Sequence, residues 1–80
     1  MKLFWFKLAR EELERAEPAA KLALIATVSQ LKVMPDVGRA GRVESTREIE
    51  VPGHPYLIVY RVCPSGLQVL AVHSARQNTA

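Results

Sequence analysis

The sequence predicts a single α+β domain over residues 1–80, with an N-terminal helical hairpin packed on one face of a small antiparallel sheet. Two patterns lead to this class. In the first part of the chain, hydrophobic residues recur at the three-to-four-residue spacing of helices, whereas after residue 46 they alternate with polar residues as in strands. Short segments rich in proline and glycine separate the later strands, which indicates antiparallel neighbours. The expected order of elements is β-α-α-β-β-β.

One short strand and two helices are expected in the N-terminal half. Leu3–Phe6 is aromatic and apolar, which favours a strand. Leu8–Ala16 has the spacing of a helix, but it is so short that packing must hold it. Pro18 ends this helix because proline lacks a backbone donor, yet proline suits the first turn of the next helix. The second helix is therefore expected to run from Pro18 or Ala19 to about Val33.

The C-terminal half is expected to contain a loop and then three strands. Residues 35–46 include a proline and two glycines and show no hydrophobic period, so they are predicted to form a loop. Residues 76–80 are expected to be a flexible tail. Tight turns are expected between the strands, which form an antiparallel meander. The three strands are expected at Arg47–Val51, Tyr56–Val62 and Leu67–His73.

Composition excludes several classes of protein. Eleven Lys and Arg against eight Asp and Glu give a net charge of +3, which suits an acidic partner without requiring one. Cys63 is the only cysteine, so no internal disulfide is possible, and two histidines add too few ligands for a structural zinc site. No apolar run has the length of a signal peptide or a membrane span, so a cytoplasmic protein is expected. Without nucleotide-binding or nucleophile motifs, we expect neither a cofactor nor a metal.

Arginine side chains are the first candidates for a binding site. Arg61 lies in the predicted central strand, and a charge cannot stay unpaired under a core. Either its face of the sheet is open to solvent, or Glu48 or Glu50 neutralises it. On an open face, Arg47 and Arg76 would join Arg61 in a small anion-binding patch. Surface ion pairs with the glutamates are the alternative.

Histidine side chains are the second candidates, because they titrate near neutral pH. His73 ends the last strand, three residues before Arg76. An imidazole beside a guanidinium could move a proton on a phosphodiester whose phosphate the arginine holds. The alternative is a strand-end histidine that bonds to the backbone. His54 lies in a predicted turn and is expected to be solvated.

Several segments of the chain share a pattern with one family. They are Gly38–Val43, Thr46–Ile49, Val51–Val62, Val69–Leu70 and His73–Arg76. Together these segments resemble the RelE/ParE superfamily of type II toxins, which are small proteins of plasmid-stabilisation modules. The N-terminal half agrees more loosely, through Trp5 in the first strand and through Pro18, which two alanines follow. Between Leu13 and Pro18 the first helix is shorter than in typical members.

This resemblance implies a toxin that stops growth until an acidic cognate antitoxin neutralises it. RelE-like members cut messenger RNA on the ribosome, whereas ParE-like members inhibit DNA gyrase without catalysis of their own. The stretch Val51–Tyr56, and Ala71 in place of a basic residue, favour the ParE-like branch. An attenuated relative that only binds a partner is another alternative. A RelE-like endoribonuclease would use Arg47, Arg61, His73 and Arg76.

Two sets of contact residues follow from these expectations. The second helix is apolar nearly all round, so an antitoxin helix or a second copy of the chain is expected to cover it. The residues expected to bind the target or the antitoxin are Arg39, Arg42, Arg47, Tyr60, Arg61 and Arg76. The residues expected under the antitoxin on the apolar helix are Leu22, Leu24, Ile25 and Val28.

Overall fold

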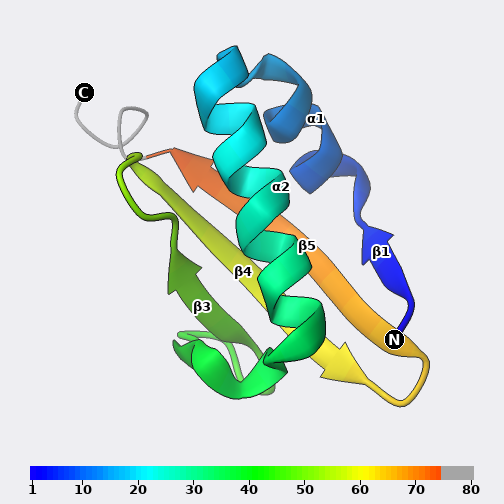
Figure 1. Ribbon diagram of the computed structural model, residues 1–80. Helices are drawn as coiled ribbons and strands as arrows, with labels where there is room; N and C mark the ends of the chain where they lie inside the picture. Colours follow the sequence, from blue (N-terminus) through cyan, green and yellow to red (C-terminus); the bar gives the residue numbers. More distant parts are fainter. Residues whose placement is uncertain (75–80) are drawn as a thin grey trace.

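A computed structural model describes residues 1–74 as two helices on one face of a five-stranded sheet (Figure 1). The predicted α+β class, with two consecutive helices, is therefore confirmed. The helices are α1 (Lys7–Arg15) and α2 (Pro18–Val33), and a short 3-10 helix, η1 (Pro35–Val37), follows them. The strands are β1 (Leu3–Trp5), β2 (Arg39–Ala40), β3 (Arg47–Glu50), β4 (Tyr56–Cys63) and β5 (Gly66–Ser74).

The sheet has the order β1-β5-β4-β3-β2 and is mixed. Neighbours from β2 to β5 are antiparallel as expected, but β1 pairs with β5 in parallel. A parallel pair needs a long crossover, which α1, α2 and the other strands provide here. At the start of β5, Gly66 has φ +144°, and a Cβ there would overlap the Lys2 carbonyl. Glycine thus lets β1 approach the turn between β4 and β5.

Residues 35–46 are not a plain loop, and this part of the prediction is wrong. They contain η1 and the two-residue strand β2, which pairs Arg39 with Glu48 and Ala40 with Arg47. Side chains from outside the segment hold η1 in place: the Tyr60 hydroxyl donates to the Pro35 carbonyl and the Arg47 guanidinium donates to the Asp36 carbonyl. Local sequence patterns do not show such distant contacts. The predicted tail, residues 76–80, lies outside the described residues.

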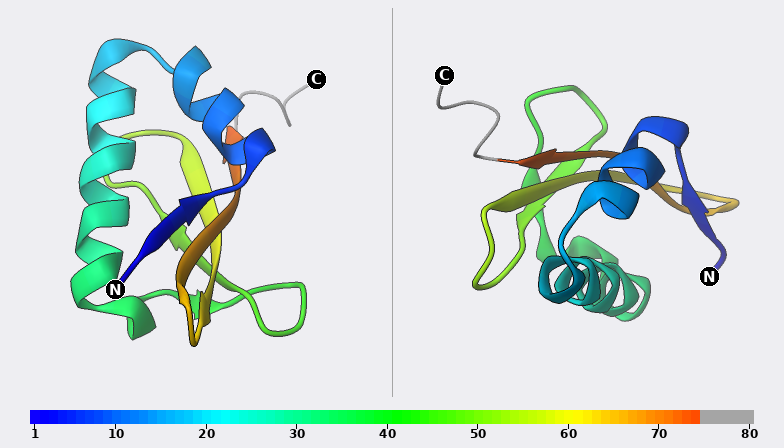
Figure 2. Two further views of the ribbon diagram at one scale, coloured as in Figure 1. Left: turned by 90° about the vertical axis from the view of Figure 1, so that its right-hand side faces the viewer. Right: turned by 90° about the horizontal axis from the view of Figure 1, so that it is seen from above.

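The core lies between α2 and the sheet. Turned views show α2 as a layer on one side of the strands, while residues 41–46 project on the other side (Figure 2). The face of the sheet away from the helices stays open. From α2 the buried side chains are Ala20, Leu24, Thr27, Val28 and Leu31. From the strands the fully buried ones are Ile58, Tyr60, Leu67 and Val69.

Strand register places polar and apolar residues side by side on the open face. Ile58 and Tyr60 of β4 are buried under the helices, so the alternate residues of that strand turn to the open face. Two of them, Leu57 and Val59, each pair with one residue of β3 and one of β5. The two resulting rows are Glu48, Val59 and Ala71, and Glu50, Leu57 and His73.

Candidate binding site on the open face of the sheet

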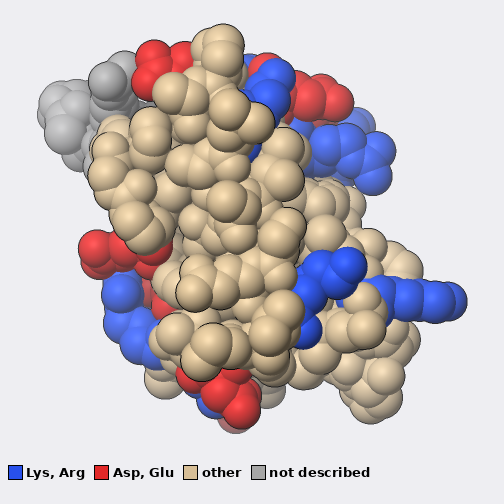
Figure 3. All heavy atoms as spheres, viewed as in Figure 1, with Lys and Arg blue, Asp and Glu red and all other residues tan. Residues whose placement is uncertain are grey.

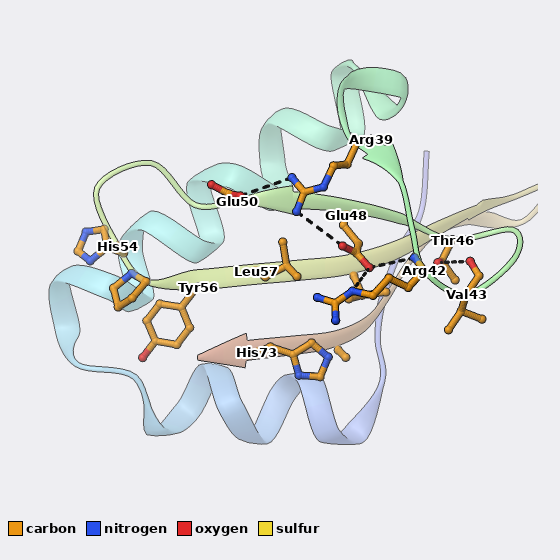
Figure 4. A pocket seen from close by; sticks show the side chains of 13 residues that line it. Arg39, Arg42, Val43, Thr46, Glu48, Glu50, His54, Tyr56, Leu57 and His73 are labelled. Atoms are coloured by element: carbon orange, nitrogen blue, oxygen red, sulfur yellow. Dashed lines mark hydrogen bonds and ion pairs between the residues drawn. The ribbon is translucent and has the colours of Figure 1, made fainter. Parts of the chain in front are cut away.

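A hollow of about 720 Å³ lies on the open face of the sheet (Figure 4). Leu57, Val59 and Ala71 line its apolar part. The remaining walls come from the segment between β2 and β3, from the turn before β4 and from charged side chains of the strands; the first two contribute Arg42, Val43, Thr46, His54 and Pro55. This combination of an apolar floor with a charged rim is typical of a binding surface.

Glu48 is the buried charge of this site. Only 6% of the residue is exposed. Its carboxylate accepts a 3.1 Å hydrogen bond from the backbone N–H of Arg42 and lies 3.7 Å from the Arg42 Nε and from an Arg39 guanidinium nitrogen. Arg39 also lies 3.5 Å from the exposed carboxylate of Glu50. The charges of these two arginines are therefore balanced within the chain, although both side chains remain more than half exposed.

The segment that carries Arg42 is held in shape by Thr46. Its hydroxyl donates a 2.6 Å hydrogen bond to the Val43 carbonyl, and its backbone N–H bonds to the same oxygen at 3.2 Å. The Gly41 N–H in turn donates to the Thr46 carbonyl at 2.8 Å. In Figure 4 the Arg42 guanidinium and the exposed His73 imidazole both lie at the hollow. His54 lies at its far end beside Tyr56 and is only partly exposed.

Arg47 and Arg61 extend from opposite faces of the sheet. Arg47 pairs with the buried Tyr60 and lies on the helix side, where it donates a 2.8 Å hydrogen bond to the Gly38 carbonyl. Arg61 follows Tyr60 along the strand and lies on the open side, where two of its nitrogens donate to Gln68 Oε1 at 3.0 and 2.6 Å.

The expected anion-binding patch is therefore not assembled among the described residues. Arg47 also lies 3.7 Å from the Asp36 carboxylate, on the far side of the sheet from Arg61 and His73. Arg61 pairs with the neutral amide of Gln68 rather than with a glutamate. The fourth expected member, Arg76, lies outside the described residues. The alternative expectation, ion pairs with the glutamates, holds for Arg39 and Arg42, whereas Arg47 pairs with Asp36.

Tyr60 is a core residue, which corrects its expected place at the binding surface. It is fully buried; its hydroxyl donates to the Pro35 carbonyl at 2.7 Å and accepts from the Gly38 N–H at 3.0 Å. Burial raises the pKa of the Tyr60 phenol above 10.0. The pattern of alternating hydrophobic residues placed Tyr60 beside Ile58 on the helix side, so this signal was present in the sequence.

The expected apolar contact set on α2 divides into two pairs. Leu24 and Val28 are buried against the sheet and cannot contact a partner. Leu22 and Ile25 are exposed on the outer side of the helix. The reason is geometric: residues three or four apart share a helix face, and Leu24, Val28 and Leu31 form the buried one.

The role of Glu48 was missed by the sequence reasoning. That reasoning offered it as a partner for Arg61, but it binds Arg39 and Arg42. Alternation along β3 could have placed the Glu48 side chain on the face of the sheet opposite to that of Ile49, which is the open face, beside the arginines of the preceding segment.

In the part of the chain that the structure describes, no group of three or more residues could hold a metal ion. Within that part, no helix is long and apolar enough to span a membrane.

Comparison with known structures defines the class of this fold. A chain of the E. coli RelBE toxin-antitoxin complex matches with a TM-score of 0.78 at 16% identity, covering 90% of this chain and 93% of that chain. A chain of the chromosomal ParDE system from P. aeruginosa matches with a TM-score of 0.67 at 23% identity, covering 92% and 95%. The fold is that of RelE and ParE toxins.

Sequence comparison identifies the family. The sequence model of the "ParE toxin of type II toxin-antitoxin system, parDE" matches residues 3–79. "Putative toxin Y4kP" of Sinorhizobium fredii is 35% identical over 69 residues, and the match covers 81% of this chain and 71% of that protein. The chain belongs to the ParE toxin family of type II toxin-antitoxin systems. The resemblance drawn from residues 38–76 is confirmed.

Proposed function

We propose that the free protein inhibits growth by binding DNA gyrase, without cutting RNA, and that an acidic cognate antitoxin neutralises it. The family match supports the ParE-like branch. The observation that carries the proposal is the separation of Arg47 from Arg61 and His73 by the sheet. General acid-base cleavage needs these groups within hydrogen-bond reach of one phosphodiester. With Arg47 bound to Gly38 on the other side, the described residues of that set do not converge.

A gyrase assay tests this activity directly. We expect the purified protein to inhibit supercoiling of relaxed plasmid by DNA gyrase in a dose-dependent way, while relaxation by topoisomerase I continues as the control. Undisturbed supercoiling at saturating protein would contradict the proposal. Induced expression in bacteria without antitoxin tests toxicity itself, since normal growth with confirmed soluble protein would leave only the non-toxic binding module.

The second candidate function is RelE-like cleavage of messenger RNA on the ribosome. Two observations favour it: the fold similarity to a chain of the RelBE complex, and the presence of His73 and Arg42 at one hollow. A toeprint on translated message separates the two activities. New ends within codons that disappear in a His73→Ala variant would establish cleavage. An unchanged toeprint combined with inhibited gyrase supports the ParE-like action.

The antitoxin is expected to be acidic because the chain carries +3 and exposes arginines at the hollow. The related RelBE and ParDE structures are those of toxin-antitoxin systems, which is why we propose the same kind of partner here. Electrostatic attraction of this kind raises the association rate at low salt. We expect Arg39→Gln and Arg42→Gln to slow association with the antitoxin encoded beside the toxin. Arg15→Gln, an exposed arginine on α1, is the matched control.

A further inference from the structure

Glu48 neutralises the most exposed guanidinium group of the hollow. The Arg42 side chain is 83% exposed, and among the described residues Glu48 is its one carboxylate partner, at 3.7 Å. The Glu48 side chain is only 8% exposed, so salt and water screen its charge weakly. The backbone N–H of Arg42 donates to the same carboxylate at 3.1 Å and keeps it in place behind the guanidinium.

The charges of the arginines and glutamates around the hollow cancel. Among the described residues, this charged lining consists of Arg39, Arg42, Glu48 and Glu50. Figure 3 shows basic and acidic side chains next to one another at the edge of the molecule where β3 lies. The chain as a whole carries a net charge of +3, so the balance is a local property of this site. A polyanion that approaches the hollow therefore meets no excess of positive charge from these residues.

Without the carboxylate of Glu48, the hollow would suit a phosphodiester. The Arg42 guanidinium and the exposed His73 imidazole both lie at it, and such groups hold a phosphate and move a proton. Arginine binds carboxylate and phosphate in the same way, so Glu48 takes the place that a phosphate would take. A phosphate on the free side of Arg42 would still lie within about 8 Å of the Glu48 carboxylate, which is inside the screening length of physiological salt. The buried carboxylate would therefore repel it.

We propose that Glu48 is a specificity-determining residue, whose buried carboxylate keeps single-stranded RNA from binding at the hollow. Removal of this one charge should then create RNA binding. Glutamine has the same shape as glutamate, and its amide oxygen can still accept the hydrogen bond from the Arg42 N–H. The inference rests on the proposed function and deepens it, because it names the residue through which the site avoids RNA.

RNA binding by variants of the full chain tests this inference. The probe is a fluorescein-labelled strand of ten uridines, and its binding is followed by fluorescence anisotropy over a range of salt concentrations. We expect Glu48→Gln to bind the probe at low salt at least tenfold more tightly than the wild type. The slope of log affinity against log salt should steepen by about 0.7, because one more phosphate of a single strand is neutralised. Adding Arg42→Gln to this variant should abolish both changes.

Two control variants separate this effect from simpler causes. Glu14→Gln changes the net charge by the same amount, at an exposed residue of α1 outside the hollow. Leu24→Ala destabilises the fold without changing its charge, because it truncates a fully buried side chain. If circular dichroism shows that Glu48→Gln folds poorly, Glu48→Thr takes its place, since threonine is uncharged and suits a strand. RNA binding by the wild type or by either control as tight as that of the Glu48 variant would overturn the proposal.

Gyrase inhibition by the wild type tests the proposed function on its own. Tighter RNA binding by Glu48→Gln, combined with unaffected gyrase in the wild-type assay, would contradict the gyrase activity and support the role of Glu48. Inhibited gyrase, combined with equal RNA binding by Glu48→Gln and the wild type, would support the proposed function and overturn the role of Glu48. The two proposals therefore fail through different measurements.

Discussion

The backbone N–H of Gly38 donates a 3.0 Å hydrogen bond to the hydroxyl of Tyr60, 22 residues further along the chain. The same hydroxyl donates to the Pro35 carbonyl, so one buried side chain of β4 holds η1 at both ends. A Cβ at residue 38 would overlap the Tyr60 hydroxyl and lie 2.9 Å from the Glu48 carbonyl oxygen. Glycine is therefore required for this close approach. Arg39 and Arg42, which reach the open face, come shortly after Gly38 in the sequence, so this hydrogen bond also helps to fix their position.

Tyr60→Phe should lower the free energy of unfolding by about 1–3 kcal/mol, because it leaves the buried Gly38 N–H without its partner. Urea unfolding followed by circular dichroism measures the change. Tyr56→Phe is the matched control: its side chain is only partly buried, and the loss should stay within about 0.5 kcal/mol. Equal losses in the two variants would mean that the Tyr60 hydroxyl does not stabilise the segment.

Alkaline pH should reduce the contribution of Tyr60 to stability. Burial raises the pKa of this phenol above 10.0 in the folded chain. Between the unfolded pKa and the folded pKa, the unfolded chain loses the proton and the folded chain keeps it, so stability falls as pH rises through this window. The difference in unfolding free energy between wild type and Tyr60→Phe should be constant below pH 10.0 and shrink above it. Urea titrations in steps up to pH 11 provide the test, and a difference that grows with pH would contradict it.

The fold could be predicted where a local pattern decides the structure. Pro18 marks the first residue of α2, and the alternation around Ile58 gives β4 with the correct side buried. The pairing of β1 with β5 could not be derived in the same way, because a strand of three residues carries no sign of its partner or direction. η1 was missed for a similar reason: this helix is held by hydrogen bonds from the side chains of Tyr60 and Arg47.

The sequence predicted several of the residues that form the site, but not how their side chains are arranged or paired. Arg39 and Arg42 do lie at the open face, as expected. The sequence alone does not show whether they are free or paired, because their partner Glu48 is recognised only once its buried position beside them is known. Arg47 and Arg61 looked equivalent as charges, although strand alternation sends them to opposite faces. Distances between charges come from tertiary structure, and a one-dimensional pattern gives only the side on which each lies.

Glu48→Gln should destabilise the chain by about 1.5–3 kcal/mol, since it removes a buried charged acceptor from the Arg42 N–H and from two guanidinium groups. Thermal and urea unfolding measure the effect. Glu50→Gln is the matched control, because its exposed carboxylate contacts Arg39 alone and such surface pairs contribute about 0–1 kcal/mol. If both variants unfold alike, the buried carboxylate does not organise the segment before β3.

Truncation of two leucines of α2 should have very different effects on stability, although both leucines belong to the same apolar run. Leu24 is fully buried against the sheet, so Leu24→Ala should cost about 2–5 kcal/mol through lost burial and the cavity it leaves. Leu22→Ala should change stability by no more than about 0.5 kcal/mol, since this side chain is exposed. Its effect should appear instead in binding of the antitoxin, which is expected to cover this side chain. Urea unfolding and an antitoxin-binding assay on both variants separate the two roles. A loss of stability in Leu22→Ala comparable to that in Leu24→Ala would place Leu22 in the core and remove it from the surface expected to bind the antitoxin.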